Sequence, residues 1–340
     1  MLSKKVLLFS LAVTMLVSCK TSNIDGSATF NHDNKYDSEF PSYSVSKDLK
    51  KISNSIKKMD IIAFYATYYF PKNIHVNKSS ITEELLETYE DDMTISHESV
   101  SGTATVIYNN NNLVGLLTCA HVIDFPDSVF SYYDEDEHTI QTLSVKIKQQ
   151  NHISGIPSGE PIEIIAQDTK KDIAILSRKT EINDTPVQTL RYPIGNVKDL
   201  QWGSIVYIMG YPLGNLMVTR ALVSLSDKVK SGVFITDALY NHGISGSPVF
   251  AIRDGAPNFE LVGMASSAAA QASNILVPDE DYKKTSRLKS NYDGKIFVDN
   301  NKLISYGVTF SVTITEIITF IHSNEKALTD KGFNMNDFFM

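Results

Sequence analysis

Residues 235–250 read ITDALYNHGISGSPVF, and this stretch places a serine inside a glycine turn behind an apolar run. Gly243 and Gly246 flank Ser245, and glycine adopts the backbone angles that a tight turn requires. The hydroxyl of Ser245 can then project into a cleft while neighbouring backbone N–H groups face the same point. The pattern is typical of a loop that presents a nucleophilic serine, and such a serine requires a general base.

A histidine and a carboxylate lie upstream of this loop in matching strand contexts. His121 ends the apolar segment LLTCAH (116–121), and Asp172 begins the segment DIAIL (172–176). Taken singly, a histidine at a strand end is more often structural, and an aspartate in such a run is more often a turn residue. Together with Ser245 they predict a catalytic triad. The chain order His, Asp, Ser differs from that of α/β-hydrolases, in which the serine comes first.

Short apolar or alternating runs between turn residues dominate the chain from residue 60 onward. Strands are predicted at 60–70, 103–108, 113–119, 143–147, 162–166, 173–176, 205–209, 217–225, 233–236, 249–252, 261–265 and 307–311. Helical spacing appears in 47–59 and 312–323, whereas 77–99 is predicted to be a long polar loop that carries a short helix at 82–89, and 270–303 a polar surface insertion. Many short strands with few helices indicate an all-β sandwich or barrel.

Composition limits the classes of partner. With 340 residues, of which 42% are hydrophobic, the chain can bury a full core. The formal net charge of −8 argues against a nucleic-acid partner, which requires a basic surface.

The N-terminal segment is typical of a targeting signal. Residues 1–5 are basic, residues 6–17 are apolar but too short to span a bilayer, and LVSC (16–19) has the small residues of a cleavage site. This pattern resembles a bacterial lipoprotein signal, so residues 1–18 are expected to be removed and Cys19 to be lipidated. An ordinary secretory signal and an N-terminal membrane anchor are the alternatives. The expected location is the bacterial cell envelope, as a membrane-anchored lipoprotein that is periplasmic or surface-exposed.

The residues after this signal and the second cysteine have simpler interpretations. Residues 19–46 are rich in Ser, Asn, Asp and Lys, which predicts a flexible tether. With Cys19 lipidated, Cys119 is the remaining one of two cysteines, so no intramolecular disulfide is expected. Cys119 has no glycine turn of its own, and we expect a small buried hydrophobe rather than a nucleophile.

The order of these segments resembles that of the trypsin-like serine proteases of the Deg/HtrA type, over about residues 60–321. The matching segments are SGTATVI (101–107), LLTCAHVI (116–123), DIAIL (172–176), VYIMGYPLG (206–214), VTRALVSL (218–225), TDALYNHGISGSP (236–248), ELVGMASS (260–267) and SYGVTF (305–310). Each segment is a weak signal alone, but all occur in the order of the family. Two departures are Ile244, where Asn is common, and Ser247, where Gly is usual.

The resemblance implies an all-β fold of two six-stranded β-barrels, the chymotrypsin/trypsin-like fold, with a short C-terminal helix and the site between the barrels. The protease domain is expected at 47–325, with barrel 1 at about 58–180 and barrel 2 at about 200–312. Residues 326–340 are predicted to be a C-terminal tail, and no PDZ domain is expected there.

The resemblance also implies a serine endopeptidase that hydrolyses protein or peptide substrates through an acyl-enzyme intermediate. Ser245 is then the nucleophile, His121 the general base, and Asp172 the carboxylate that orients the imidazole. The backbone N–H groups of Gly243 and Ser245 are expected to form the oxyanion hole. This chemistry needs no metal and no cofactor. Ser247 is the competing serine, but only Ser245 has the family's flanking glycines.

In the family, the segment before the nucleophile lines the substrate pocket. The expected pocket residues are Leu239, Tyr240, His242, Ala265 and Ser266. With Leu239 at the pocket floor and no acidic residue there, small or medium aliphatic residues are expected on the acyl side of the cut, rather than Lys or Arg. The alternative function is a catalytically latent or inactive protease-fold lipoprotein that acts as a binding module, and the long loop at 77–99 would permit latency.

Overall fold

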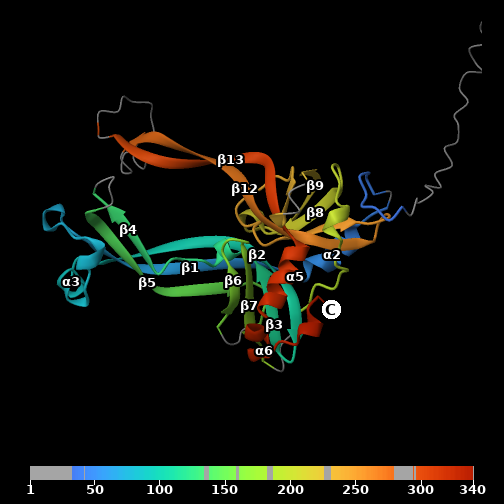
Figure 1. Ribbon diagram of the computed structural model, residues 1–340, viewed down its shortest axis with the longest axis horizontal. Helices are drawn as coiled ribbons and strands as arrows, with labels where there is room; N and C mark the ends of the chain where they lie inside the picture. Colours follow the sequence, from blue (N-terminus) through green and yellow to red (C-terminus); the bar gives the residue numbers. More distant parts are fainter. Residues whose placement is uncertain are drawn as a thin grey trace, which may run out of the picture. The chain divides into compact units, whose positions relative to one another are not determined.

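The computed structural model describes residues 33–41, 43–133, 138–157, 161–181, 187–225, 231–278, 294 and 296–339. The described part is mostly β, with few helices (Figure 1). The helices are α2 (Ser46–Ser53), α3 (Glu83–Thr88), α5 (Ile314–Ser323) and α6 (Glu325–Asp330). The strands are β1 (Ile56–Tyr69), β2 (Thr94–Asn110), β3 (Leu113–Thr118), β4 (Ser128–Tyr132), β5 (Ile140–Ile153), β6 (Glu163–Asp168), β7 (Ile173–Lys179), β8 (Ile205–Gly210), β9 (Met217–Leu225), β10 (Val233–Thr236), β11 (Pro248–Ile252), β12 (Phe259–Pro278) and β13 (Ile296–Thr313).

The strands form two units that follow each other in sequence. The first is a 7-stranded sheet in the order β4-β5-β1-β2-β3-β7-β6, and the second is a closed barrel in the order β10-β13-β12-β11-β8-β9. The predicted all-β fold with a closed six-stranded second barrel and a C-terminal helix is confirmed. The first unit differs from the predicted six-stranded barrel: it is a sheet of 7 strands with β4 and β6 at its edges, because β4 pairs with the long strand β5.

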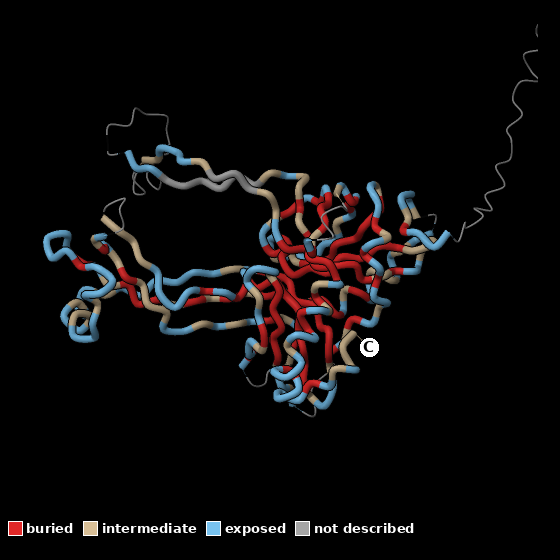
Figure 2. Tube along the Cα trace, in the orientation of Figure 1, coloured by how far each residue is buried: buried red, intermediate tan, exposed pale blue. Residues whose placement is uncertain are grey.

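One hydrophobic core joins the two units. Every residue of β3 (LVGLLT) and of β8 (IVYIMG) is buried, so these strands are apolar along their whole length rather than alternating. Figure 2 shows the buried residues gathered in the sheet and the barrel. Thr103 of β2 ties the units together: its N–H donates to the Ser245 carbonyl at 2.8 Å, and its hydroxyl donates to the Gly243 carbonyl at 2.7 Å. The first unit therefore holds the serine loop of the second.

Two segments predicted to be polar loops contain strands. Part of the predicted loop at 77–99 is the first half of β2, which pairs with β1 from Thr67↔Thr94 onward. The predicted surface insertion at 270–303 contains the far halves of β12 and β13, which pair with each other up to Pro278↔Ile296. Cross-strand pairing satisfies the backbone whatever the polarity of the side chains, so polar composition alone did not reveal these strands.

The C-terminal residues are more structured than the predicted tail. Leu328 of α6 and Phe333 are buried, and the Phe333 ring packs edge-on against Tyr108 of β2 at a centroid distance of 4.8 Å. Leu328 and Phe333 give this segment apolar side chains that pack into the core, which a flexible tail lacks.

The described part of the predicted tether is also partly ordered. Tyr36 is buried and donates a hydrogen bond to Glu260 Oε2 at 2.6 Å, and the Arg253 guanidinium lies over its ring. The predicted signal at 1–18 and Cys19 lie outside the described residues, so those predictions remain predictions. Among the described helices, none has both the length and the apolar character needed to cross a membrane.

Candidate active site

His121 and Asp172 lie close together because His121 follows strand β3, Asp172 precedes strand β7, and these two strands are paired. β3 pairs with β7 at Thr118↔Ala174, so the end of β3 and the start of β7 lie at the same edge. His121 lies in the 3-10 turn Ala120–Val122 beyond β3, and Asp172 immediately precedes β7. Asp172 has φ +58°, a left-handed conformation that aspartate adopts more readily than most residues.

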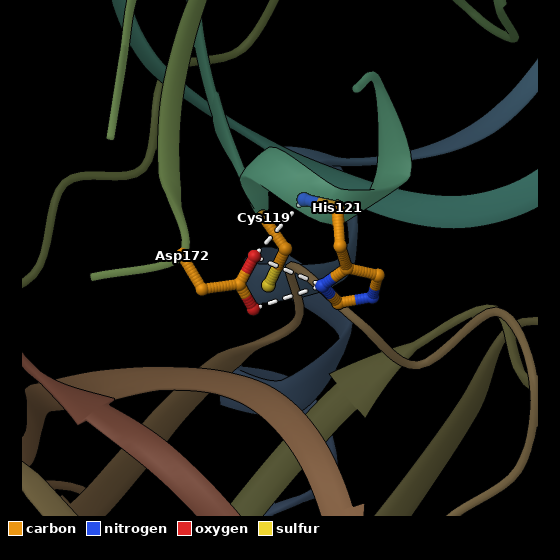
Figure 3. Close-up of side chains that lie close together, drawn as sticks. All are labelled: Cys119, His121 and Asp172. Carbon is orange, nitrogen blue, oxygen red and sulfur yellow. Dashed lines mark hydrogen bonds and ion pairs between the residues drawn. The ribbon is translucent and has the colours of Figure 1, made fainter. Parts of the chain in front are cut away.

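The histidine ring and the carboxylate form a close pair (Figure 3). Nδ1 of His121 lies 2.9 Å from each carboxylate oxygen of Asp172, and the His121 backbone N–H donates to Oδ1 at 3.0 Å. Because an ionised carboxylate only accepts hydrogen bonds, the ring proton lies on Nδ1. Nε2 is then the free acceptor, and it lies 2.9 Å from Ser245 Oγ.

The serine loop requires glycine on both sides of Ser245. Gly246 has φ +88°, and a Cβ there would collide with the Thr103 carbonyl and lie 2.6 Å from Thr118 Oγ1. Gly243 has φ +100°, and a Cβ there would collide with the carbonyl oxygen of Tyr211. The loop is therefore pressed against the first unit, and this contact aims Ser245 at His121.

The backbone donors beside Ser245 are available. Within the described residues, the N–H groups of Gly243 and Ser245 donate no hydrogen bond to another protein group. The Gly246 N–H, in contrast, donates to the Ala265 carbonyl at 2.9 Å, and the Ser247 N–H donates to the Ile244 carbonyl at 3.0 Å. Both predicted oxyanion-hole donors are therefore open.

Ser266 of β12 supports the carboxylate from the second unit. Its hydroxyl donates to Asp172 Oδ2 at 2.5 Å. Burial raises the pKa of Asp172, but the hydrogen bonds and charge of His121, together with the Ser266 hydroxyl, outweigh burial and hold the pKa below its ordinary value. Asp172 therefore stays ionised beside the imidazole.

Tyr240 lies against the serine on its other side. Its hydroxyl is hydrogen-bonded both to Ser245 Oγ and to the Ser266 carbonyl oxygen, and its side chain is buried. Burial raises the pKa of Tyr240, so the phenol is neutral in the ordinary pH range. Ser245 Oγ also lies 3.1 Å from the Ser266 carbonyl oxygen, which makes a small polar cluster around the nucleophile.

The predicted pocket residues occupy different positions. Tyr240 and Ser266 touch Ser245, whereas Leu239 is 63% exposed and His242 is exposed. Leu239 therefore does not form the floor that the sequence predicted, because the chain turns its side chain outward and the next residue inward. Ala265 is fully buried, and its carbonyl accepts from the Gly246 N–H and from the Cys119 thiol.

Cys119 lies beside the same carboxylate. One donor atom each of Cys119, His121 and Asp172 lies within 4.8 Å of the other two, which is the spacing of a metal site (Figure 3). The donor chemistry does not suit a metal, however. Burial raises the pKa of the Cys119 thiol well above its ordinary value, and the thiol donates to the Ala265 carbonyl at 3.3 Å. The His121 Nδ1 proton already lies between the ring and the carboxylate.

The sequence interpretation missed two contacts: the Ser266 hydroxyl on Asp172, and the Tyr240 hydroxyl on Ser245. Both residues were assigned to the pocket by their place near the serine. The Ser266–Asp172 contact joins segments that are far apart along the chain, and the Tyr240–Ser245 contact depends on how the loop before the serine folds back on itself, so no local pattern signals either contact.

A known protein family matches the part of the chain that carries this site. Residues 102–264 match the family model of the trypsin-like peptidase domain. Among solved structures, the chain is similar to the serine endoprotease from Yersinia pestis, with 16% sequence identity and a TM-score of 0.41, over 86% of this chain and 69% of that chain. No curated protein matches the chain.

Proposed function

From the premise that residues 102–264 form a trypsin-like peptidase domain, we propose that the chain is a serine endopeptidase that cleaves protein or peptide substrates. The observation that supports this most directly is the unbroken line of hydrogen bonds from Asp172 through His121 to Ser245. The Deg/HtrA type rests on the order of the sequence motifs.

These hydrogen bonds support a proposed role for each side chain. His121 Nε2 is placed to take the Ser245 proton as Oγ attacks the scissile carbonyl carbon, because a serine hydroxyl alone is a weak nucleophile at neutral pH. Asp172 holds the ring in the tautomer that leaves Nε2 free and stabilises the imidazolium that forms. The histidine then returns the proton to the leaving amine as the C–N bond breaks.

The free backbone donors stabilise the charge that develops in this step. The N–H groups of Gly243 and Ser245 donate to the oxyanion of the tetrahedral intermediate. Water then attacks the acyl-enzyme ester, with His121 again removing a proton, and the carboxylic acid product leaves as Ser245 regains its hydrogen.

A fluorophosphonate probe tests the activated serine without knowledge of the substrate. The wild-type protein should be labelled, and Ser245→Ala should not. Ser247→Ala is the matched control: its hydroxyl is buried two residues away and has no hydrogen-bond partner among the described residues, so that variant should label like the wild type. A folded wild-type protein that does not label would overturn the proposal and favour the binding-module alternative.

The proposal includes anchoring of the enzyme in a bacterial envelope membrane by lipid on Cys19. It is supported by the basic start, the apolar run and the small residues before this cysteine. Mass spectrometry of the mature protein should find Cys19 as its first residue with acyl chains attached. An unmodified Cys19, or a protein that still has residues 1–18, would contradict the anchor and leave the peptidase proposal intact.

A further inference from the structure

We propose that Tyr240 is the residue that limits substrate size, so that the enzyme cleaves after glycine or alanine and excludes larger residues on the acyl side. This inference rests on the proposed peptidase function and narrows the small-to-medium aliphatic preference that the sequence predicts.

Tyr240 closes the space between the two walls of the predicted pocket. One wall is the segment before the nucleophile, and the other is the part of β12 that carries Ala265 and Ser266. The Tyr240 hydroxyl bonds to the carbonyl oxygen of Ser266 and therefore bridges these walls. The side chain is 7% exposed, so its ring fills the interior rather than lying across the surface.

The position of the hydroxyl leaves little room beside the nucleophile. A reacting carbonyl carbon approaches Oγ to about 3–3.5 Å. The Tyr240 oxygen is in hydrogen-bond contact with the same Oγ, so the flank of Ser245 that faces the pocket is already filled. A hydrogen or a methyl group on the substrate fits beside this oxygen, whereas a longer side chain overlaps the ring.

The loop that carries Tyr240 is anchored at both ends. The Ala238 carbonyl accepts from the buried Thr309 hydroxyl at 2.9 Å. On the other side, the His242 carbonyl accepts from the Leu213 N–H at 2.8 Å. A substrate that displaced Tyr240 would also break the contacts of its hydroxyl with Ser245 and Ser266, so the ring acts as a fixed wall.

The hydroxyl and the ring have separable effects. The Ser266 carbonyl only accepts, so the Tyr240 proton or the Ser245 proton must point to it. Ser245 has one proton, and the proposed reaction requires this proton to point to His121 rather than to the Ser266 carbonyl. Tyr240→Phe removes the hydroxyl that contacts Ser245 and keeps the ring, whereas Tyr240→Ala removes both the hydroxyl and the ring.

Peptide diphenyl phosphonates test the inference, because they react with the serine and carry the acyl-side residue as a variable group. Analogues of glycine, alanine, valine and phenylalanine are used with wild type, Tyr240→Phe, Tyr240→Leu and Tyr240→Ala. Wild type should react with the alanine analogue about 100-fold faster than with the phenylalanine analogue, a discrimination typical of steric exclusion. Tyr240→Phe should keep this ratio, Tyr240→Leu should admit valine, and Tyr240→Ala should reduce the ratio at least tenfold.

A small fluorophosphonate, which carries no acyl-side residue, distinguishes a failure of the Tyr240 inference from a failure of the proposed peptidase function. If it labels wild type and Tyr240→Ala, but both show the same size preference, the role of Tyr240 is wrong and the peptidase function stands. If wild type reacts equally fast with the alanine and phenylalanine analogues, the size limit by Tyr240 is also refuted, because the ring then moves aside for the larger substrate. If the small probe labels neither protein, both the function and the inference fail. Tyr240→Leu preserves an apolar core side chain, so the test stands even if Tyr240→Ala does not fold.

Discussion

Replacing Ser266 with alanine removes the hydroxyl that β12 of the second unit donates to Asp172. The bond is short, 2.5 Å, and its acceptor is a carboxylate whose side chain is only 18% exposed. Hydrogen bonds to charged groups contribute about 1.5–3 kcal/mol each to stability. The hydrogen bonds from His121 to Asp172 remain and water reaches part of the carboxylate, so we expect a loss of about 1–2 kcal/mol in the free energy of unfolding.

The effect on rate should be smaller than the effect on stability. Asp172 is ionised both before and during the reaction, so the Ser266 bond accelerates the reaction only by the amount by which it strengthens as imidazolium forms. We expect the bimolecular rate of fluorophosphonate labelling to fall about 3- to 10-fold, or about 0.7–1.4 kcal/mol. The pKa of Asp172 should rise, because one of the groups that lower it is gone.

The assay compares the labelling rate and the urea midpoint of wild type, Ser266→Ala and Ser247→Ala. The last variant removes a buried hydroxyl of the same size that has no partner among the described residues, and such a change is nearly neutral. If Ser266→Ala labels as fast as Ser247→Ala and unfolds at the same urea concentration, the reasoning about this hydrogen bond is wrong.

Three other predictions follow from packing and charge. Gly246→Ala combines a left-handed backbone with a collision at the Thr103 carbonyl, so it should lower the free energy of unfolding by about 2–5 kcal/mol, measured in urea, and a smaller loss would show that the loop can shift. Asp172→Asn removes a carboxylate whose pKa is lowered by folding; the stability deficit of the variant against wild type should shrink as the pH falls below about 4, and a deficit that grows in acid would reverse the assigned shift. Phe333→Ala should cost about 3–5 kcal/mol, because its ring is buried against Tyr108, and a neutral thermal scan would mean that the C-terminal segment does not contribute to the core.

Much of the fold was readable in short apolar runs. The predicted run at 217–225 matches β9, the run at 233–236 matches β10, and the runs at 113–119 and 205–209 differ from β3 and β8 by one residue. These strands are bounded by turn residues and bury apolar side chains, so composition and period report them directly. The first half of β2 and the far halves of β12 and β13 were missed because each lies in a segment that is polar overall, and backbone pairing does not depend on apolar side chains.

The site was readable to the same degree. The glycines beside Ser245 mark the serine loop, since only glycine fits where Gly246 meets the Thr103 carbonyl. The apolar segments that end at His121 and begin at Asp172 identify the other two residues, because strand ends deliver side chains to a common edge. The chain order His121, Asp172, Ser245 then groups these three residues as one candidate triad.

The sequence by itself determined which side chains are present for the chemistry, which segments become strands, and where the backbone must turn through glycine. These are local properties, set by the covalent geometry of a few neighbouring residues. Only the tertiary structure decided what surrounds the serine: the Ser266 hydroxyl on Asp172, the Tyr240 hydroxyl on Ser245, and the outward turn of Leu239. The first is a contact between the two strand units, and the other two depend on how the loop before the serine packs against β12. Such contacts depend on how separately specified segments pack, and no residue's own neighbours in the chain specify that.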